Sequence, residues 1–417
     1  MQKKSQKSTT TAGLRGAHWS EDQLPSDMSA RTMSLVAADG GTSYGVLYQR
    51  GGEKCVVMVM HPREFLPTHY LVPEILSGGA AVWVQAPRSV GNDIRLEHET
   101  SLLDVAAGAQ LLRDEGYSDI VALGNSGGAG LYSFYVQQSN TDPTQRIAKT
   151  PGGKPTRLME IELPAIDGVI FVSPHPGQGK LLQSCIDPSV TDEKDPLSID
   201  ESLFPFSPKN GFVKPPQSST YSPDFVERYR QAQKARVERI DAWARQAITV
   251  RMEAKKRLKS AFDANDILVS SHTPIVTVWR TDADLRCFDL SLEPSDRKYG
   301  SLWGGNPFIS NLGSVGFARV CTADSWLSTW SGLSSNAALS KTAPAITQPS
   351  LMIQYTGDNS IFSGDADEIF QSIGAAKKER VKISGNHHGQ AVLEGAPHGR
   401  IEAGATIRRW LSEHFHC

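Results

Sequence analysis

The stretch Asp119-Ile-Val-Ala-Leu-Gly-Asn-Ser-Gly-Gly128 decides the fold class. Its first half is an apolar run typical of a buried strand, and the segment 127–138 that follows is typical of a helix. Between them, Gly124-x-Ser126-x-Gly128 is the pattern of a sharp strand-to-helix turn that exposes a serine hydroxyl. The small glycines let strand and helix approach while Ser126 Oγ projects. We therefore predict that Ser126 is a nucleophile.

The same turn admits two other interpretations: a glycine-rich turn that only packs tightly, or one that binds phosphate. The stretch 124–130 does not spell GxGxxG and lacks the lysine of a P-loop. It also follows the fifth predicted strand rather than the first. A nucleotide-binding site is therefore disfavoured.

Outward from this turn, runs rich in β-branched residues alternate with helix-length segments, which indicates a mainly parallel sheet. Residues 32–38 and 43–48 flank the turn-forming Asp39-Gly40-Gly41 and predict an antiparallel hairpin. We expect an α/β fold with a mainly parallel eight-stranded sheet flanked by helices. The other predicted strands lie at 55–60, 80–85, 119–123, 167–172, 350–355 and 380–383, and the helices begin near 69 or span 97–115, 127–138, 365–378 and 400–414.

The alternation stops after residue 176 and resumes at 350, and we therefore predict that the chain has three parts. They are a flexible tail at 1–25, a core formed by 26–176 and 345–417, and a mostly helical insertion at 177–344.

Within the insertion, the Pro-, Ser- and Asp-rich segment 184–219 indicates a long surface connection. Ser222-Pro223 then opens a charged helix that reaches about residue 262. A solvated face is favoured over a basic ligand-binding surface for this helix. The runs 275–279 and 287–292 predict an extra hairpin.

A serine hydroxyl becomes a nucleophile when a histidine takes its proton and a carboxylate fixes the tautomer of that histidine. Both partners are expected after the insertion, in the order serine, acid, histidine. Asp358 follows the predicted strand 350–355, at the end where α/β sheets place their ligands. It is favoured over Asp365 and Asp367, which stand where a helix opens.

The histidine is expected in Ser384-Gly-Asn-His-His-Gly389, after the last predicted strand. Either imidazole can reach the serine, and spacing favours His388, with His387 as a neighbour that lines the pocket. His398 is assigned a structural role. The pair His387 and His388 beside Asp358 could also ligate zinc, but the sequence contains no HExxH motif and the Ser126 turn disfavours this alternative. We expect neither a metal nor a cofactor.

Acyl transfer also needs hydrogen-bond donors for the developing oxyanion, a role that backbone amides fill. Gly127 N–H is one candidate. The turn His61-Pro62-Arg63 should supply the other, and Pro62 has no N–H, so Arg63 N–H is the candidate. For His61-Pro62 the alternative is a simple strand terminator. His61 and His175 both follow predicted strands and are candidate pocket residues.

Over most of residues 30–176 and 345–417 the chain resembles the α/β-hydrolase superfamily. The resemblance implies that the insertion forms a cap over the site, and it names no substrate. The site residues that it implies are a triad of Ser126, Asp358 and His388 with an oxyanion hole from the Arg63 and Gly127 amides.

Three features depart from many members of this superfamily. Pro62 stands where many relatives have glycine, the turn is Asn-Ser-Gly rather than His-Ser-Met, and the insertion is long. The insertion's tryptophans are candidate pocket walls, although a buried core is favoured for them; they are Trp303, Trp326 and Trp330.

Composition limits the partners. The chain has 417 residues and a formal net charge of -2 with interspersed charges, which argues against nucleic acid and against an anionic membrane surface. The five cysteines are odd in number and scattered, so we expect them to be reduced, in a cytoplasmic protein. The expected partner is a small acyl substrate, and self-association into a homo-oligomer is left open.

The predicted function is a serine hydrolase that cleaves a carboxylic ester, lactone, thioester or amide through an acyl-enzyme. The same triad would also serve carbon-carbon bond hydrolysis or acyl transfer to another acceptor. A third alternative is a ligand receptor that keeps the fold without catalysis.

Overall fold

The computed structural model describes residues 18–19 and 23–417, so most of the predicted tail 1–25 lies outside the described residues. At its centre is an eight-stranded sheet in the order β1-β2-β4-β3-β5-β6-β9-β10, in which only β2 runs against the others. This confirms the predicted mainly parallel sheet. The strands are β1 (Ser29–Val36), β2 (Thr42–Gln49), β3 (Cys55–Met60), β4 (Ala81–Gln85), β5 (Asp119–Asn125), β6 (Gly168–Val172), β9 (Ser350–Tyr355) and β10 (Lys378–Ile383).

The first two strands form the predicted hairpin, with Ser29 opposite Gln49 and Val36 opposite Thr42. Its turn needs a glycine, because Gly40 has a φ of 81°. Asp39 Oδ1 accepts the N–H of Gly41 at 3.1 Å and fixes the turn.

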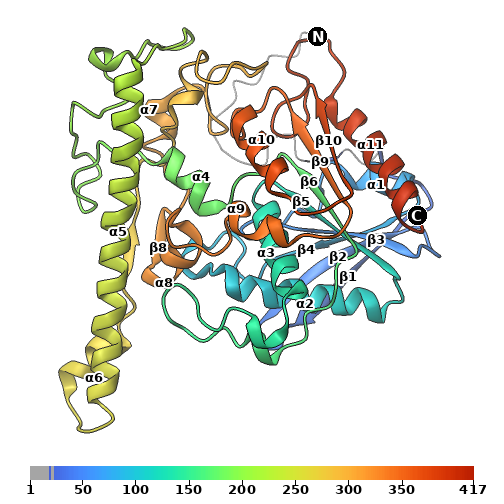
Figure 1. Cartoon of the computed structure of the whole chain (residues 1–417), viewed down its shortest axis with the longest axis horizontal. Helices are drawn as coiled ribbons and strands as arrows, with labels where there is room; N and C mark the ends of the chain where they lie inside the picture. The colour runs from blue at the N-terminus through green and yellow to red at the C-terminus, as the bar shows by residue number, and fades with distance from the viewer. Residues whose placement is uncertain (1–17, 20–22) are drawn as a thin grey trace, which may run out of the picture.

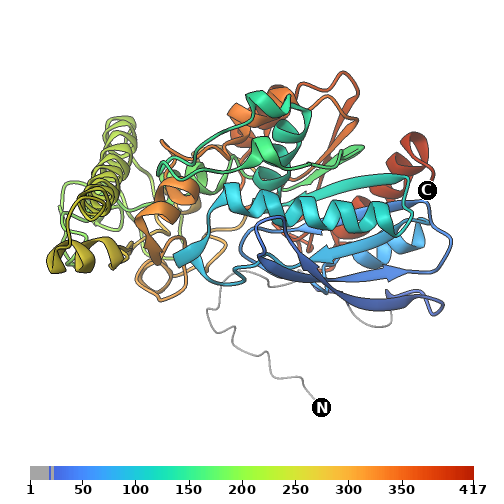
Figure 2. The same ribbon diagram turned by 90° about the horizontal axis from the view of Figure 1, so that it is seen from below.

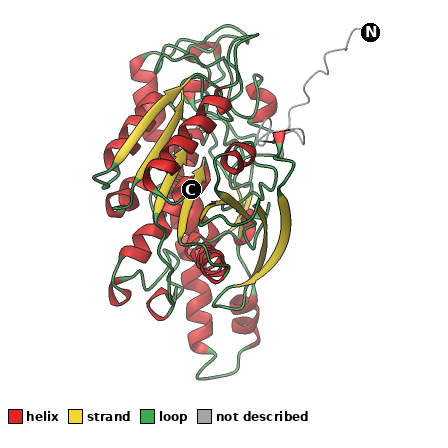
Figure 3. Cartoon of the chain, turned by 90° about the vertical axis from the view of Figure 1, so that its right-hand side faces the viewer, coloured by secondary structure: helices red, strands yellow, loops and turns green. Residues whose placement is uncertain are grey.

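The central strands are mostly apolar because helices cover both faces of the sheet (Figures 1 and 3). Every residue of β3, β4, β6 and β9 is buried. Alternate side chains of these strands enter two separate cores. One core is covered by α2 (His98–Asp114), α3 (Gly127–Asn140), α9 (Leu339–Thr342) and α10 (Ser363–Ser372), and the other by α1 (Val72–Ser77) and α11 (Gly399–His414).

Residues 177–344 fill the interval between β6 and β9. Figures 1 and 2 show the longest helix, α5 (Pro223–Arg257), at the side of the molecule far from the sheet. It begins where predicted, because Ser222 Oγ accepts the N–H of Phe225 at 3.2 Å. Besides α9, this interval also contains the shorter helices α4 (Gln178–Cys185), α6 (Ala264–Ser271), α7 (Pro307–Ser310) and α8 (Ala323–Ser325).

The last residues of this interval pack against the sheet. Residues from Ala337 onward enter the core beneath α3, and Ser133 Oγ lies 2.6 Å from Thr342 Oγ1.

The predicted hairpin of 275–279 with 287–292 is wrong. Strand β7 (Ile275–Thr277) pairs instead with β8 (Val320–Thr322), which lies much further along the chain. Residues around Cys287 form a short 3₁₀ turn, because the Asp284 carboxylate accepts the N–H of Arg286 and caps it.

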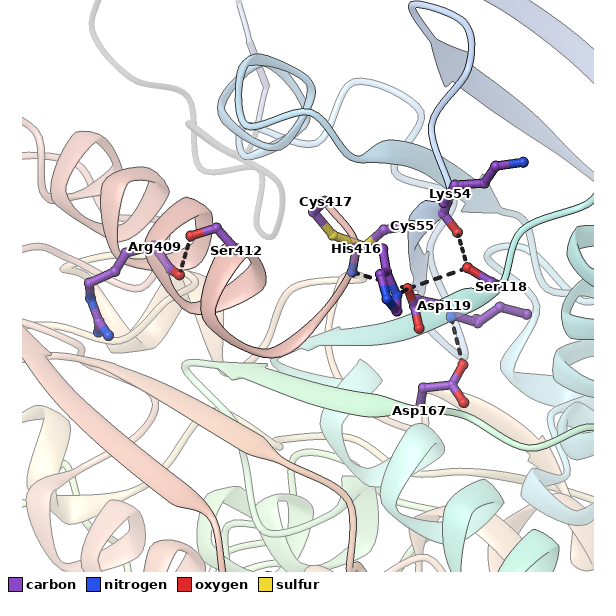
Figure 4. Close-up of a disulfide and its surroundings, with 10 residues drawn as sticks. Lys54, Cys55, Ser118, Asp119, Asp167, Arg409, Ser412, His416 and Cys417 are labelled. Atoms are coloured by element: carbon purple, nitrogen blue, oxygen red, sulfur yellow. Dashed lines mark hydrogen bonds and ion pairs between the residues drawn. A yellow bond between two sulfur atoms is a disulfide. The ribbon is translucent and has the colours of Figure 1, made fainter.

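The expectation of reduced cysteines is also wrong for two of the five. Cys55, at the start of β3, forms a disulfide with Cys417 (Figure 4). Cys185, Cys287 and Cys321 are free thiols. The disulfide removes the basis on which a cytoplasmic location was predicted, because such bonds are uncommon in reducing compartments. Within the part of the chain that the structure describes, no helix combines the length and apolarity that crossing a membrane requires.

Candidate active site

Ser126 lies on a strained turn between β5 and α3. Its backbone has φ 53° and ψ −116°, a conformation that L-residues rarely adopt. The flanking glycines are required by close approach. A Cβ on Gly124 would lie 2.6 Å from Ala129 N, and one on Gly128 would lie 2.6 Å from Met60 O. The predicted nucleophile turn therefore has the geometry that exposes Ser126 Oγ.

Asp358 lies just beyond the carboxyl end of β9 and is held rigidly. Its Oδ1 accepts the N–H of Ser360 at 2.7 Å and that of Ile361 at 3.1 Å. Its side chain is buried, and its Oδ2 lies 2.8 Å from Nδ1 of His387. A buried carboxylate with its second oxygen on an imidazole fixes the tautomer and orientation of that ring.

The choice of His388 as the partner of this acid is wrong, since the imidazole on Asp358 is that of His387. The turn after β10 explains the difference. Asn386 Oδ1 accepts the N–H groups of His388 and Gln390, both at 3.0 Å, and this turn sends the two rings in different directions. The ring of His388 stands nearly perpendicular to that of His387, with 4.9 Å between the centroids. His388 therefore lies in the position that had been expected for His387, as a neighbour in the pocket.

One cavity of about 70 Å³ brings most of the predicted site together. Ser126 and His387 both line it, and Asp358 stands behind His387. Gln178, the first residue of α4, also lines this cavity and was not predicted; its position directly after Gly177 and close to His175 was the available signal. The other predicted site residues that line it are His61, Arg63, His175 and His388.

Residues of the insertion form the far wall of this cavity. They are Leu181, Leu302, Trp303 and Phe317. Trp326 and Trp330 are fully buried in the insertion's own core instead, as favoured from the sequence. Trp303 is therefore the one of the three tryptophans that reaches the site.

The prediction that Arg63 N–H serves the oxyanion hole does not fit the geometry. That N–H points to His61 Nδ1 at 3.2 Å, so it is already used. The Arg63 side chain makes a two-pronged ion pair with Asp93, with both N···O distances 2.8 Å. Its guanidinium lies 5.0 Å from the ring centroid of Trp330, so Arg63 ties the core to the insertion. Gly127 N–H, at the first position of α3, remains a predicted donor.

Two further imidazoles beside Ser126 are held neutral. Burial lowers the pKa of His61 well below its ordinary value, and the charge of Arg63 lowers it further. Burial lowers the pKa of His175 to about 3. Both rings therefore carry no charge at neutral pH.

The strand order, the single reversed strand, the serine turn after β5, the acid after β9 and the histidine after β10 together form one known arrangement. The chain has the α/β-hydrolase fold. Among the described residues of this α/β-hydrolase fold, no group of three or more His, Cys, Asp or Glu side chains is arranged to hold a metal ion.

Comparison with known proteins adds structural neighbours only. No family model matches the sequence, and no curated protein matches it. Solved structures that match include DcsB in complex with its substrate analogue, at 12% identity and a TM-score of 0.49, with 93% of this chain and 99% of that chain covered. The α/β hydrolase GrgF from Penicillium sp. sh18 matches at 11% identity and a TM-score of 0.49, with 93% and 100% covered. The Pyrococcus furiosus esterase Pf2001 matches at 12% identity and a TM-score of 0.42, with 96% and 95% covered. Similarity at this level says nothing about the substrate of this chain.

Proposed function

We propose that this chain is a serine hydrolase that cleaves a carboxylic ester, lactone, thioester or amide through an acyl-enzyme on Ser126. The observation that carries the proposal is the buried hydrogen bond of 2.8 Å between Asp358 and His387, at the cavity that Ser126 also lines. Nucleophile, base and orienting acid are thus supplied by three separate strand ends.

In the acylation step, His387 Nε2 takes the proton of Ser126 Oγ as the Oγ–C bond forms and the substrate carbonyl becomes an oxyanion. Asp358 holds the Nδ1–H, so Nε2 is the ring nitrogen that is left to accept the serine proton, and the carboxylate then stabilises the imidazolium. The imidazolium then gives its proton to the leaving group as the C–O, C–S or C–N bond breaks.

In the deacylation step, water takes the place of the leaving group. His387 removes a proton from that water while its oxygen attacks the acyl carbon, and the proton then returns to Ser126 Oγ as the acid leaves. The apolar far wall of Leu181, Trp303 and Phe317 favours an acyl group with an apolar body.

A fluorophosphonate probe tests the proposal. We expect it to modify Ser126 in the wild-type chain, with the adduct located by peptide mass spectrometry, and to leave Ser126→Ala unmodified. Absence of an adduct on the wild-type chain would instead favour a non-catalytic ligand receptor.

The two adjacent histidines supply a matched pair of variants. We expect His387→Ala to slow labelling and ester turnover by about 10³-fold or more, because the serine loses its base. His388→Ala should keep most of the activity, since its ring does not bind Asp358. Equal loss in both variants would contradict the assignment of His387. Incorporation of labelled water oxygen into the released acid then separates hydrolysis from acyl transfer.

A further inference from the structure

Two imidazoles beside Ser126 have a fixed tautomer. His61 Nδ1 accepts the backbone N–H groups of Arg63 at 3.2 Å and Glu64 at 3.1 Å. His175 Nδ1 accepts the N–H of Gly177 at 3.1 Å. A ring nitrogen that accepts a hydrogen bond carries no proton, so the proton of each neutral ring resides on Nε2. Both rings are therefore N–H donors at Nε2.

Both donors converge on the residue that follows the nucleophile. A Cβ placed on Gly127 would lie 2.6 Å from His61 Nε2 and 2.9 Å from His175 Nε2. The two Nε2 atoms thus lie within 3 Å of one point beside Ser126. Within the described residues neither Nε2 has a hydrogen-bond acceptor, and both rings line the cavity. Two N–H donors that lie this close together in the cavity, with no acceptor in the protein, can both donate to one oxygen of a bound ligand.

The backbone after β3 has no free N–H group to donate near this point, so the donors there must be side chains. Pro62 has no N–H, and the N–H groups of the next two residues are bound to His61 Nδ1. The backbone N–H groups of this turn therefore orient the His61 imidazole and do not donate to a ligand. Gly127 supplies the space, because any side chain there would overlap both rings.

We propose that His61 Nε2–H donates to the substrate carbonyl oxygen during acyl transfer, with His175 Nε2–H as a second donor and Gly127 N–H beside them. An oxyanion hole built from neutral imidazoles replaces the amide after β3. This role rests on the serine-hydrolase function proposed above. It also explains why the turn after β3 can contain Pro62, which has no N–H, and why the residue after the nucleophile is a glycine.

The test compares His61→Phe, which keeps a flat ring without the donor, with His61→Gln, whose Nε2 restores a donor at a similar reach. On a short-chain p-nitrophenyl ester we expect His61→Phe to lower kcat about 10²- to 10³-fold with KM nearly unchanged. His61→Gln should recover at least about 10-fold of that loss. His175→Phe should show a smaller loss in the same direction. Replacing the exposed His272 by Phe is the control for histidine substitution as such.

A spectroscopic readout separates donation from packing. The infrared carbonyl stretch of a slowly hydrolysed, ¹³C-labelled acyl-enzyme should move to higher frequency in His61→Phe, because a hydrogen bond to the carbonyl oxygen is lost, and return towards the wild-type value in His61→Gln.

The outcomes distinguish the two proposals. If the fluorophosphonate labels Ser126 in every variant while kcat and the carbonyl frequency stay at wild-type values in His61→Phe, the imidazole donors are refuted and the hydrolase function stands. An equal loss in the Phe and Gln variants with an unchanged carbonyl frequency refutes them as well. If the wild-type chain is not labelled, both proposals fall.

Discussion

Gly127 has no room for a side chain in this site. In Gly127→Ala the new Cβ would lie 2.6 Å from His61 Nε2 and 2.8 Å from Gln178 Nε2, so these groups must move. We expect ester turnover to fall about 10- to 100-fold, because displaced donors lose their alignment. Stability should hold, since alanine favours the helix.

Gly130→Ala is the control for this variant. It lies in the same helix, and its Cβ would meet nothing nearer than Ala337 O at 3.3 Å. Denaturant unfolding and ester kinetics on both variants check the prediction, and equal activity of the two would contradict it.

Buried histidines make the fold sensitive to acid. Burial lowers the pKa of His69 and His98 to about 4 and that of His175 to about 3. In the unfolded chain these histidines have a pKa near 6.5. Between pH 6.5 and 4 they therefore bind protons in the unfolded chain that they do not bind in the folded chain. Stability should therefore fall with pH by about 1.4 kcal/mol per unit for each such histidine. Asp282, whose pKa burial raises to about 6, acts in the opposite direction over part of this range.

His98→Leu measures the contribution of one of these histidines to the pH dependence of stability. Neither ring nitrogen of His98 has a hydrogen-bond partner among the described residues, so its replacement removes an unsatisfied polar group. Urea unfolding between pH 6 and pH 4.5 should show a slope shallower than in the wild-type chain, by up to about 1.4 kcal/mol per pH unit. Parallel curves would show that His98 does not titrate on unfolding.

At the scale of residues, the sequence predicted where the serine and the acid lie better than it predicted how the histidine rings are oriented. The serine and the acid follow from motif and order, because both stand directly after strands. The choice between His387 and His388 depends on a turn set by Asn386, whose side-chain hydrogen bonds leave no mark in spacing. The loss of the Arg63 amide to His61 Nδ1 likewise depends on a side-chain torsion.

At the scale of elements, a fully buried ion pair helps to hold the irregular connection after α4. Asp187 Oδ2 accepts Nε of Arg280 at 2.9 Å and its Nη2 at 2.6 Å, and Asn311 Nδ2 adds a third contact at 3.1 Å. Both charged side chains are almost fully buried. Asp187→Leu should destabilise the chain by about 3–5 kcal/mol, because the guanidinium is left unpaired.

The double variant Asp187→Leu with Arg280→Met tests the reason. Removing both charges should recover much of the loss, since a buried pair replaced by apolar groups is often close to neutral. Denaturant midpoints and limited proteolysis of 186–222 measure both variants. A double variant as unstable as the single one would show that the shape of the pair, not its charge, matters.

The central strands of the sheet were predictable because each carries its own signal, a short apolar run bounded by turn residues. The pairing of β7 with β8 was not, because strands of only three residues are too short to show a periodicity. Their register is set by the surrounding insertion core.

At the scale of the whole molecule, the ends of the hydrolase core are linked. Helix α11 covers one face of the sheet, and the chain beyond it returns to the start of β3 (Figure 4). There His416 Nδ1 lies 2.8 Å from Asp119 Oδ2, next to the disulfide of Cys417 with Cys55. Scattered cysteines gave no sign of this pairing, since the partners are 362 residues apart and meet only once the sheet has formed.

This disulfide should stabilise the whole sheet, because it closes a loop over nearly the entire core in the unfolded chain. We expect Cys417→Ser to lower the free energy of unfolding by about 2–5 kcal/mol. Guanidinium unfolding with and without a reductant supplies its own control: reductant should bring the wild-type chain down to the stability of Cys417→Ser and leave that variant unchanged. Ester turnover should persist in both, because the bond lies at the amino end of β3, opposite the edge that carries Ser126. A wild-type chain insensitive to reductant, with Cys417→Ser equally stable, would show that the link contributes nothing to the fold.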